Sequence, residues 1–361
     1  MKLTTKTITI ASTCAAALLL SAFIFAQQGP PPGGAPGGGR GGSGGGRGPG
    51  TPDACGGRSS LPQVACASDV AAMMASMPDK AYATPASPRK ILVLCRANGF
   101  VHSSIPLAAK MVEYLGDRTG AWSTTITYDH TVITAENLKQ YDALFLDSTT
   151  GAFLDDANDP AGSEVRKKAL LDFVKSGKGL AGIHAATDSY HGNGGGRGAP
   201  PAAGAPAAAP AQPQGTWPEF NQMIGGFFKF HWTYPTLISV KIDDPKSPLT
   251  QMFGPRGYEV VDETYTFAQD SFSRKRVHVL TSINYDRMSQ NDKDKEPAAT
   301  KRTDGDYALS YIQRVGNGRV FYEAHGHDEK VYYGRPFLLH MLAGIQYALG
   351  DLKADDSPSV Q

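Results

Sequence analysis

The fold is decided by one stretch, Gly179-Leu180-Ala181-Gly182-Ile183-His184-Ala185-Ala186-Thr187-Asp188-Ser189-Tyr190-His191. A short apolar run ends abruptly at His184, and small and polar residues follow it. This pattern predicts a buried strand that runs into a tight turn and the start of a helix. In an open α/β sheet, ligands bind at the carboxyl ends of the parallel strands. We therefore expect the side chains of this turn to point into a crevice.

Similar units lie upstream of this stretch. Aliphatic runs predict strands at 91–95 and 141–147, and an alternating pattern predicts one at 124–128. Amphipathic spacing predicts helices over 105–118 and 163–176, with Gly177 as the stop of the second. Strands that alternate with helices in this way indicate βαβ units and a parallel sheet.

The downstream half reads mainly as strands. We expect strands at 236–242, 258–267 and 277–283, and a hairpin of 307–315 with 319–323 around Gly316-Asn317-Gly318. A closing helix over 337–349 presents an apolar face of leucine and isoleucine.

The N-terminal end is typical of a secretory signal. Lys2 and Lys6 precede an apolar run from Ile8 to Phe25, which ends in small and polar residues. We expect residues 1–26 to be a signal peptide that exports the protein to the periplasm or the cell exterior. We expect no membrane span after signal cleavage, because no further apolar run of that length follows.

Glycine and proline, at 41 and 25 residues, set the predicted domain limits. We expect segment 27–88 to be a disordered Gly/Pro-rich leader, with a short helix over 64–77 that belongs to no domain. The folded domain is expected to span 89–350. It contains a low-complexity insertion at 192–215, and a disordered tail follows at 351–361.

Charge and cysteine content limit the function further. The net charge is +1, with 35 basic and 34 acidic residues, so nothing indicates a nucleic-acid partner. Cys55 and Cys66 flank a short polar loop and are either a disulfide or two free thiols. Cys95 lies in an apolar run and is expected to be a buried small hydrophobe.

Histidine carries most of the chemistry in this chain. Six of the nine histidines lie in loops after expected strands or beside a Gly-Gly turn: His102, His184, His191, His231, His325 and His327. We expect His130, His278 and His340 to be structural. Glu263 and Asp328 lie where they can join the first group.

Two kinds of site fit histidine and carboxylate in one crevice. One is a divalent metal such as zinc, for which the candidate ligands are His184, His191, His325 and His327. The other is a general acid and base, because histidine titrates near neutrality. His325 and His327, two apart on an extended segment, are expected to share one face. No short spacing such as His-x-x-x-His favours the metal.

The turn after residue 183 has the layout of a nucleophile elbow, with the reactive residue between strand and helix. Here the elbow residue is His184, where a thiol or hydroxyl nucleophile would stand. Cys95 lies in a strand. The sequence therefore argues against a thiol amidotransferase.

Six sequence blocks resemble the ThuA-like (trehalose utilisation) family over about residues 90–350. They are Gly99-Phe100-Val101-His102-Ser103-Ser104, Gly182-Ile183-His184-Ala185-Ala186-Thr187, Trp217…Ile224-Gly225-Gly226-Phe227-Phe228…His231, Asp262-Glu263-Thr264-Tyr265, Gly318-Arg319-Val320-Phe321-Tyr322 and Gly326-His327-Asp328. This chain departs from the family at Ala308-Leu309-Ser310, at the insertion and at His325, where the family often has a small or aliphatic residue.

The resemblance implies an α/β fold with a flavodoxin-like, doubly wound, mainly parallel sheet of the class I glutamine amidotransferase type. It also implies a small-molecule carbohydrate partner, in particular 3-keto-glycosides. Our first hypothesis is therefore an exported keto-glycoside hydrolase, lyase or sugar isomerase. Its expected catalytic residues are His184, His327, Glu263 and Asp328, and its expected substrate-binding residues are His102, His231, Thr187, Asp188, Trp217 and Tyr190.

Two alternatives stay open at this point. One is a non-catalytic carbohydrate-binding module that has the same crevice. The other is a structural or interaction protein whose glycine-rich leader docks on the cell surface. The sequence alone fixes neither the oligomeric state nor the cofactor.

Overall fold

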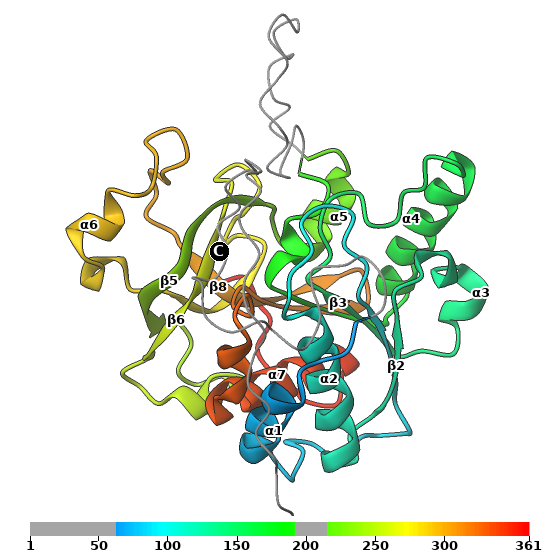
Figure 1. Cartoon of the computed structure of the whole chain (residues 1–361). Coiled ribbons are helices and arrows are strands. Elements are labelled where there is room, and N and C mark those ends of the chain that lie inside the picture. The colour runs from blue at the N-terminus through cyan, green and yellow to red at the C-terminus, as the bar shows by residue number, and fades with distance from the viewer. Residues whose placement is uncertain (1–62, 192–214, 361) are drawn as a thin grey trace, which may run out of the picture. The chain divides into compact units, whose positions relative to one another are not determined.

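The structure is a computed structural model that describes residues 63–191 and 215–360 (Figure 1). The predicted signal peptide, most of the predicted leader and nearly all of the insertion lie outside the described residues. The described residues all belong to one compact unit. Within these residues, no helix has both the length and the apolar character needed to cross a membrane.

The described residues form a nine-stranded sheet in the order β2-β1-β3-β4-β9-β8-β7-β5-β6. The first five strands in this order pair in parallel. Their bounds are Ser123–Thr127 (β2), Lys90–Leu94 (β1), Ala143–Asp147 (β3), Gly179–Ile183 (β4) and Gly318–Glu323 (β9). β3 and β4 are buried throughout, as expected for central parallel strands with continuous apolar runs. Their carboxyl ends, with His184 directly after β4, lie at one edge of the sheet.

The remaining strands extend the sheet in antiparallel fashion. They are Ala308–Val315 (β8), His278–Ile283 (β7), Phe228–Ile242 (β5) and Tyr258–Phe267 (β6). Four pairings are parallel and four are antiparallel, so the sheet is mixed and the prediction of a mainly parallel sheet is corrected. The predicted hairpin of β8 and β9 is confirmed. β5 begins at Phe228, eight residues earlier than the expected 236, and its register with β6 shifts twice along this early part.

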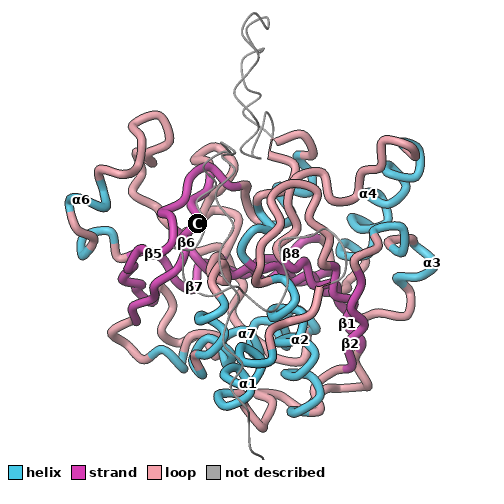
Figure 2. Tube along the Cα trace, viewed as in Figure 1, coloured by secondary structure: helices cyan, strands magenta, loops and turns pink. Residues whose placement is uncertain are grey.

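Helices cover both faces of the sheet. One core contains Ile91 and Val93 of β1, and the other contains Leu92 and Leu94, as strand alternation requires. α1, α2 and α7 lie together on the first face, and α3 and α4 lie apart from them (Figures 1 and 2). The α-helices are Ala67–Ser76 (α1), Ile105–Thr119 (α2), Ala135–Leu138 (α3), Pro160–Lys175 (α4), Pro218–Ile224 (α5), Gln290–Lys293 (α6) and Arg335–Leu349 (α7). The 3-10 segments are His130–Val132 (η1), His184–Thr187 (η2), Gln251–Phe253 (η3), Tyr285–Arg287 (η4) and Glu329–Tyr333 (η5).

The folded domain extends beyond both of its predicted limits, residues 89 and 350. Residues 63–88 were assigned to the disordered leader, but α1 lies within them, and Met73 of α1 and Met77 directly after it are buried in the core. The predicted tail also packs on the domain: Asp351 pairs with Arg89, and Ser359 donates its backbone N–H to Val277. Cys66 is disulfide-bonded, but Cys55 lies outside the described residues, so the pairing of these two residues stays a prediction.

Asp147, the last residue of β3, is a buried carboxyl, and no cation among the described residues shifts its pKa. The thiol of Cys95 donates to it at 3.5 Å. Burial raises the pKa of Asp147 well above its usual value, and the thiol opposes this only in part. The folded protein therefore holds this proton to a higher pH than the unfolded chain does, in which the carboxyl ionises near pH 4. Because the native state then binds the extra proton, this carboxyl destabilises the fold increasingly as pH rises from about 4 toward the raised pKa.

We expect Asp147→Asn to increase the free energy of unfolding by about 1 kcal/mol or more at pH 8. The reason is that the amide does not titrate, so folding no longer requires uptake of a proton at this position. The gain should shrink toward pH 4. Denaturant unfolding at both pH values measures it. Asp172→Asn on the exposed side of α4 is the control and should stay within about 0.5 kcal/mol at both. An equal effect at pH 4 and pH 8 would contradict a raised pKa of Asp147 in the folded protein.

Candidate active site

His184 lies at the centre of the site, directly after β4. Its backbone adopts φ 45°, in the left-handed region, so the chain turns sharply where the strand ends. The ring is fully buried, and its Nδ1 donates to the carbonyl oxygen of Ala324 at 2.9 Å. Burial, and then the charge of His327, lower the pKa of His184 well below its usual value. The imidazole is therefore neutral, with its proton on Nδ1.

His102 meets His184 from the loop after β1. The two Nε2 atoms lie 3.2 Å apart, and the rings cross almost at right angles. His102 is also buried, and Phe100 packs edge-on against its ring. The carboxyl ends of β1 and β4 thus contribute one imidazole each.

Glu263 and His327 complete the group from the other half of the sheet. Glu263 lies on β6, and its Oε1 is 3.5 Å from Nδ1 of His327 and 3.9 Å from Nε2 of His184. One nitrogen or oxygen atom from each of His102, His184, Glu263 and His327 lies within 4.8 Å of all the others. We call these four residues the inner cluster. Three imidazoles and one carboxylate are a donor set suited to a divalent transition metal.

The inner cluster opens toward solvent on one side. The side chain of His184 has no exposed surface, whereas those of Glu263 and His327 are 12% and 19% exposed. His231 on β5 lies on this open side, 21% exposed, with its Nδ1 3.4 Å from Oε2 of Glu263. The buried imidazoles therefore form the floor, and a ligand meets Glu263, His327 and His231 first.

Asp262 holds the loop that carries His327. Its buried carboxylate accepts backbone N–H groups from Gly326 at 2.7 Å, from Asp328 at 2.9 Å and from His327 at 3.3 Å. Burial raises the pKa of Asp262 to about 6, although the charge of His325 and these backbone donors oppose the shift. Sequence inspection did not single out Asp262. Its only signal was its place next to Glu263 on an alternating strand, where neighbouring side chains face opposite ways.

The structure brings together five of the predicted site residues: His102, His184, His231, Glu263 and His327. Their roles in catalysis stay predictions. Tyr265, which was not among the predicted site residues, packs against His184 with ring centroids 4.3 Å apart.

Three predicted site residues belong elsewhere. Asp328 accepts the backbone N–H of Lys330 and caps η5, and it is not part of the inner cluster. His191 pairs with Asp188 and not with the inner cluster. His325 does not share a face with His327, because Gly326 between them adopts φ 125° and breaks the extended backbone. The ring of His325 donates instead to Glu323 at 2.8 Å.

The two aromatic residues that were predicted to bind substrate form a buried layer. Tyr190 and Trp217 are 4% and 7% exposed and pack on each other with ring centroids 4.9 Å apart. The hydroxyl of Tyr190 donates to Asp155 at 2.9 Å. Thr187 and Asp188 are buried too, and Thr187 exchanges a hydrogen bond with the hydroxyl of Tyr322. In this structure these residues support the turn after β4 and offer no open surface to a sugar.

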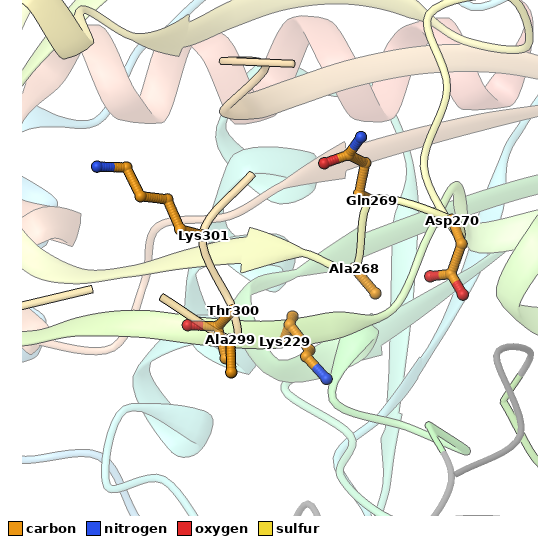
Figure 3. Close-up of a pocket in the computed structure, with 7 residues that line it drawn as sticks. All are labelled: Lys229, Ala268, Gln269, Asp270, Ala299, Thr300 and Lys301. Atoms are coloured by element: carbon orange, nitrogen blue, oxygen red, sulfur yellow. The ribbon is translucent and has the colours of Figure 1, made fainter. Parts of the chain in front are cut away.

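A separate open pocket lies beyond the end of β6 (Figure 3). It has a volume of about 480 Å³ and includes no residue of the inner cluster. The ammonium groups of Lys229 and Lys301 point in different directions in Figure 3, so they do not converge on one anion. Its lining residues are Lys229, Ala268, Gln269, Asp270, Ala299, Thr300 and Lys301.

The fold and the site define an α/β protein with a histidine–carboxylate centre at the carboxyl ends of its parallel strands. The ThuA family, described as trehalose utilisation, matches residues 90–199 and 202–348, and the chain belongs to this family. A role related to carbohydrates agrees with that description. No curated protein matches the chain.

Two solved structures are similar to this chain. A ThuA-like protein from Bacteroides uniformis is 19% identical, with a TM-score of 0.52, over 73% of this chain and 92% of its own. A ThuA-like protein from Parabacteroides merdae is 16% identical, with a TM-score of 0.48, over 74% and 93%. At this identity the first similarity supports the fold alone.

The hydrogen bonds of Asp262 predict a stability effect. In Asp262→Ala, three buried backbone N–H groups of the 326–328 loop lose their acceptor, and we expect a loss of about 2–4 kcal/mol in the free energy of unfolding. Denaturant titration at pH 7 measures this. Glu259→Gln, on an exposed position of the same strand, should change stability by no more than about 0.5 kcal/mol. Equal stability of the two variants would remove Asp262 from its supporting role.

Proposed function

We propose that this protein is an enzyme that acts on a carbohydrate, with 3-keto-glycosides as its substrate class. The observation that carries the proposal is the inner cluster, which gathers three imidazoles and a carboxylate from four separate segments in one partly open site. The family's description as trehalose utilisation supports a sugar ligand. A non-catalytic carbohydrate-binding module is not favoured, because binding of sugar hydroxyls does not require so many titratable groups around one point.

The substrate class suits acid–base chemistry. A ketone at C3 of the sugar makes the C2–H bond acidic. When a base takes the C2 proton, the electron pair of that bond becomes the C2–C3 double bond of an enolate with its charge on the C3 oxygen. The enolate then re-forms the ketone, a C1–C2 double bond forms, and the C1–O bond breaks. The leaving oxygen takes a proton, so the products are an alcohol and an unsaturated keto sugar.

The exposed residues are suited to the proton steps. His231 lies on the open side beside Glu263, and we assign it the role of the base at C2, with Glu263 orienting the ring. The inner cluster lies deeper and is assigned to the keto oxygen. Stabilising the enolate requires positive charge or N–H donors there. His184 is too deeply buried to reach C2, so the proposal moves the proton-transfer role that we first gave it to His231.

Substrates with a chromogenic leaving group test this proposal. We expect the full chain to release p-nitrophenol from p-nitrophenyl 3-keto-glucosides, and not from the corresponding unoxidised glucosides, because only the ketone acidifies C2–H. His231→Gln should lower kcat by about 10²–10⁴-fold, the usual contribution of a general base. His191→Gln, a histidine paired outside the inner cluster, is the matched control and should keep kcat within a factor of a few.

Two results would count against the proposal. One is that no p-nitrophenol is released from the α- or the β-anomer of the p-nitrophenyl 3-keto-glucoside, although circular dichroism shows that the protein is folded. The other is equal kcat for His231→Gln and the wild type. This result would remove His231 as the base but would not contradict enzymatic activity.

We also infer a flavodoxin-like arrangement for the parallel half of the sheet. The order β2-β1-β3-β4-β9 corresponds to the doubly wound order 2-1-3-4-5, with β9 as the fifth strand. Ligands of such sheets bind at the carboxyl ends of the strands, which agrees with the place of His102 and His184.

Export through the signal at residues 1–26 is a further part of the proposal, supported by the charged start and the apolar run. We expect the mature protein to be found outside the cytoplasm and to lack this segment. Cell fractionation followed by N-terminal sequencing measures both. An uncleaved protein confined to the cytoplasmic fraction would contradict export.

A further inference from the structure

We propose that His102, His184, Glu263 and His327 bind a divalent transition metal of the zinc class at the floor of the active site. This inference rests on the site of the proposed function and adds its cofactor. Two of these residues, His184 and His327, were metal candidates from the sequence. The other two candidates, His191 and His325, are replaced by His102 and Glu263 on the geometry of the site.

The spacing of the ligand atoms suits one ion. Zinc binds imidazole nitrogen and carboxylate oxygen at about 2.0–2.2 Å, so neighbouring ligands of a tetrahedral ion lie about 3.3–3.6 Å apart. The observed separations are 3.2 Å between the Nε2 atoms of His102 and His184, and 3.5 Å and 3.9 Å from Oε1 of Glu263 to His327 and His184. The remaining pairs of ligand atoms lie within 4.8 Å, so binding of an ion would draw the widest pair together by up to about 1 Å.

The hydrogen bond at the back of His184 fixes its tautomer. Because Nδ1 donates to the carbonyl oxygen of Ala324, the neutral ring directs the lone pair of Nε2 into the cluster. A metal-binding histidine usually donates its other N–H to a carbonyl or carboxylate in this way. A hydrogen bond between His102 and His184 accounts for the contact of these two rings. It does not account for the approach of Glu263 and His327 to the same point.

Further groups hold Glu263 and His327, the two less buried residues of the inner cluster. Asp262 accepts the backbone N–H groups around His327 and so fixes the loop that carries this ring. His231 lies 3.4 Å from Oε2 of Glu263, on the side away from the cluster, and so orients the carboxylate. Outer partners of this kind set ligand orientation and raise metal affinity.

The uneven exposure predicts what the metal does. His102 and His184 close its buried side, whereas Glu263 and His327 leave a partly open side. Four protein ligands fill a tetrahedral ion, so a substrate oxygen would bind on this side only by raising the coordination number. A 3-keto sugar presents its C3 carbonyl oxygen next to the C2 hydroxyl oxygen, and this pair can chelate one ion. A metal held by these residues would supply the positive charge that stabilises the enolate.

Metal content tests the site without reference to turnover. We expect the purified full chain to carry about one zinc-class ion per molecule by plasma mass spectrometry. After removal of the ion with a chelator, one equivalent of Co²⁺ should give a visible absorption band typical of low-coordinate cobalt. His184→Ala and Glu263→Gln should each weaken Co²⁺ binding by tenfold or more. His191→Gln should bind as the wild type does.

The controls separate the outcomes. Glu263→Gln keeps the size of the side chain, so it tests the carboxylate even if His184→Ala fails to fold. Wild type that takes up no Co²⁺ beyond the amount bound by Glu263→Gln would overturn the proposal. Bound metal without turnover of any keto-glycoside would leave the metal site standing and overturn the proposed function. Turnover that persists in fully metal-free protein would support the proposed function and overturn the role of the metal in it.

Discussion

The site depends on the hydrogen bond from Nδ1 of His184 to the carbonyl oxygen of Ala324. It joins the turn after β4 to the segment after β9, and these two strands are neighbours in the sheet. The same contact decides which nitrogen of the ring carries the proton and where the ring points. Burial of His184 makes the charged form unfavourable, so the bond holds a neutral imidazole whose Nε2 faces the other ligands. Geometry and protonation therefore have one common cause.

The second half of the site comes from the antiparallel strands that extend the parallel part of the sheet. β5 and β6 are antiparallel strands at the far edge of the sheet, and they bring Glu263 and His231 over the ends of β1 and β4. On β6, neighbouring residues divide two tasks. Asp262 faces the loop after β9 and fixes it, whereas Glu263 faces the inner cluster. The antiparallel extension thus closes a crevice that the parallel half leaves open.

The sequence predicted those parts of the structure that depend on local pattern. The apolar run before His184, the helix over 105–118 and the β8–β9 hairpin follow from periodicity and turn residues, and the structure contains all three. α1 was assigned to the leader because glycine and proline dominate the residues before it. Its burial comes from tertiary contacts of Met73 with the domain, and local composition does not report these.

In the site, too, the residues predicted from local pattern are confirmed as neighbours, and the errors come from the three-dimensional path of the chain. His102 and His184 were predicted because both follow parallel strands, whose carboxyl ends meet at one edge. His325 was misplaced because two residues on an extended segment share a face only if the residue between them is also extended. Gly326 adopts φ 125°, and a Cβ there would lie 2.7 Å from the hydroxyl of Tyr332. Glycine is therefore required at this position, and its turn sends the two histidines to different partners.

That separation places a buried ionic group behind the active site. Glu323 is fully buried between His325 at 2.8 Å and His340 at 3.1 Å. Burial alone would raise its pKa, but hydrogen bonds from both histidines lower it strongly, so the carboxylate is charged. The backbone N–H of His325 also donates to Glu323 at 2.9 Å, so the carboxylate holds the end of β9 directly. The next residue of the chain is Ala324, whose carbonyl oxygen accepts the hydrogen bond from Nδ1 of His184. The ionic group therefore anchors the acceptor that sets the tautomer of the central imidazole, and α7 joins the support of the site through His340.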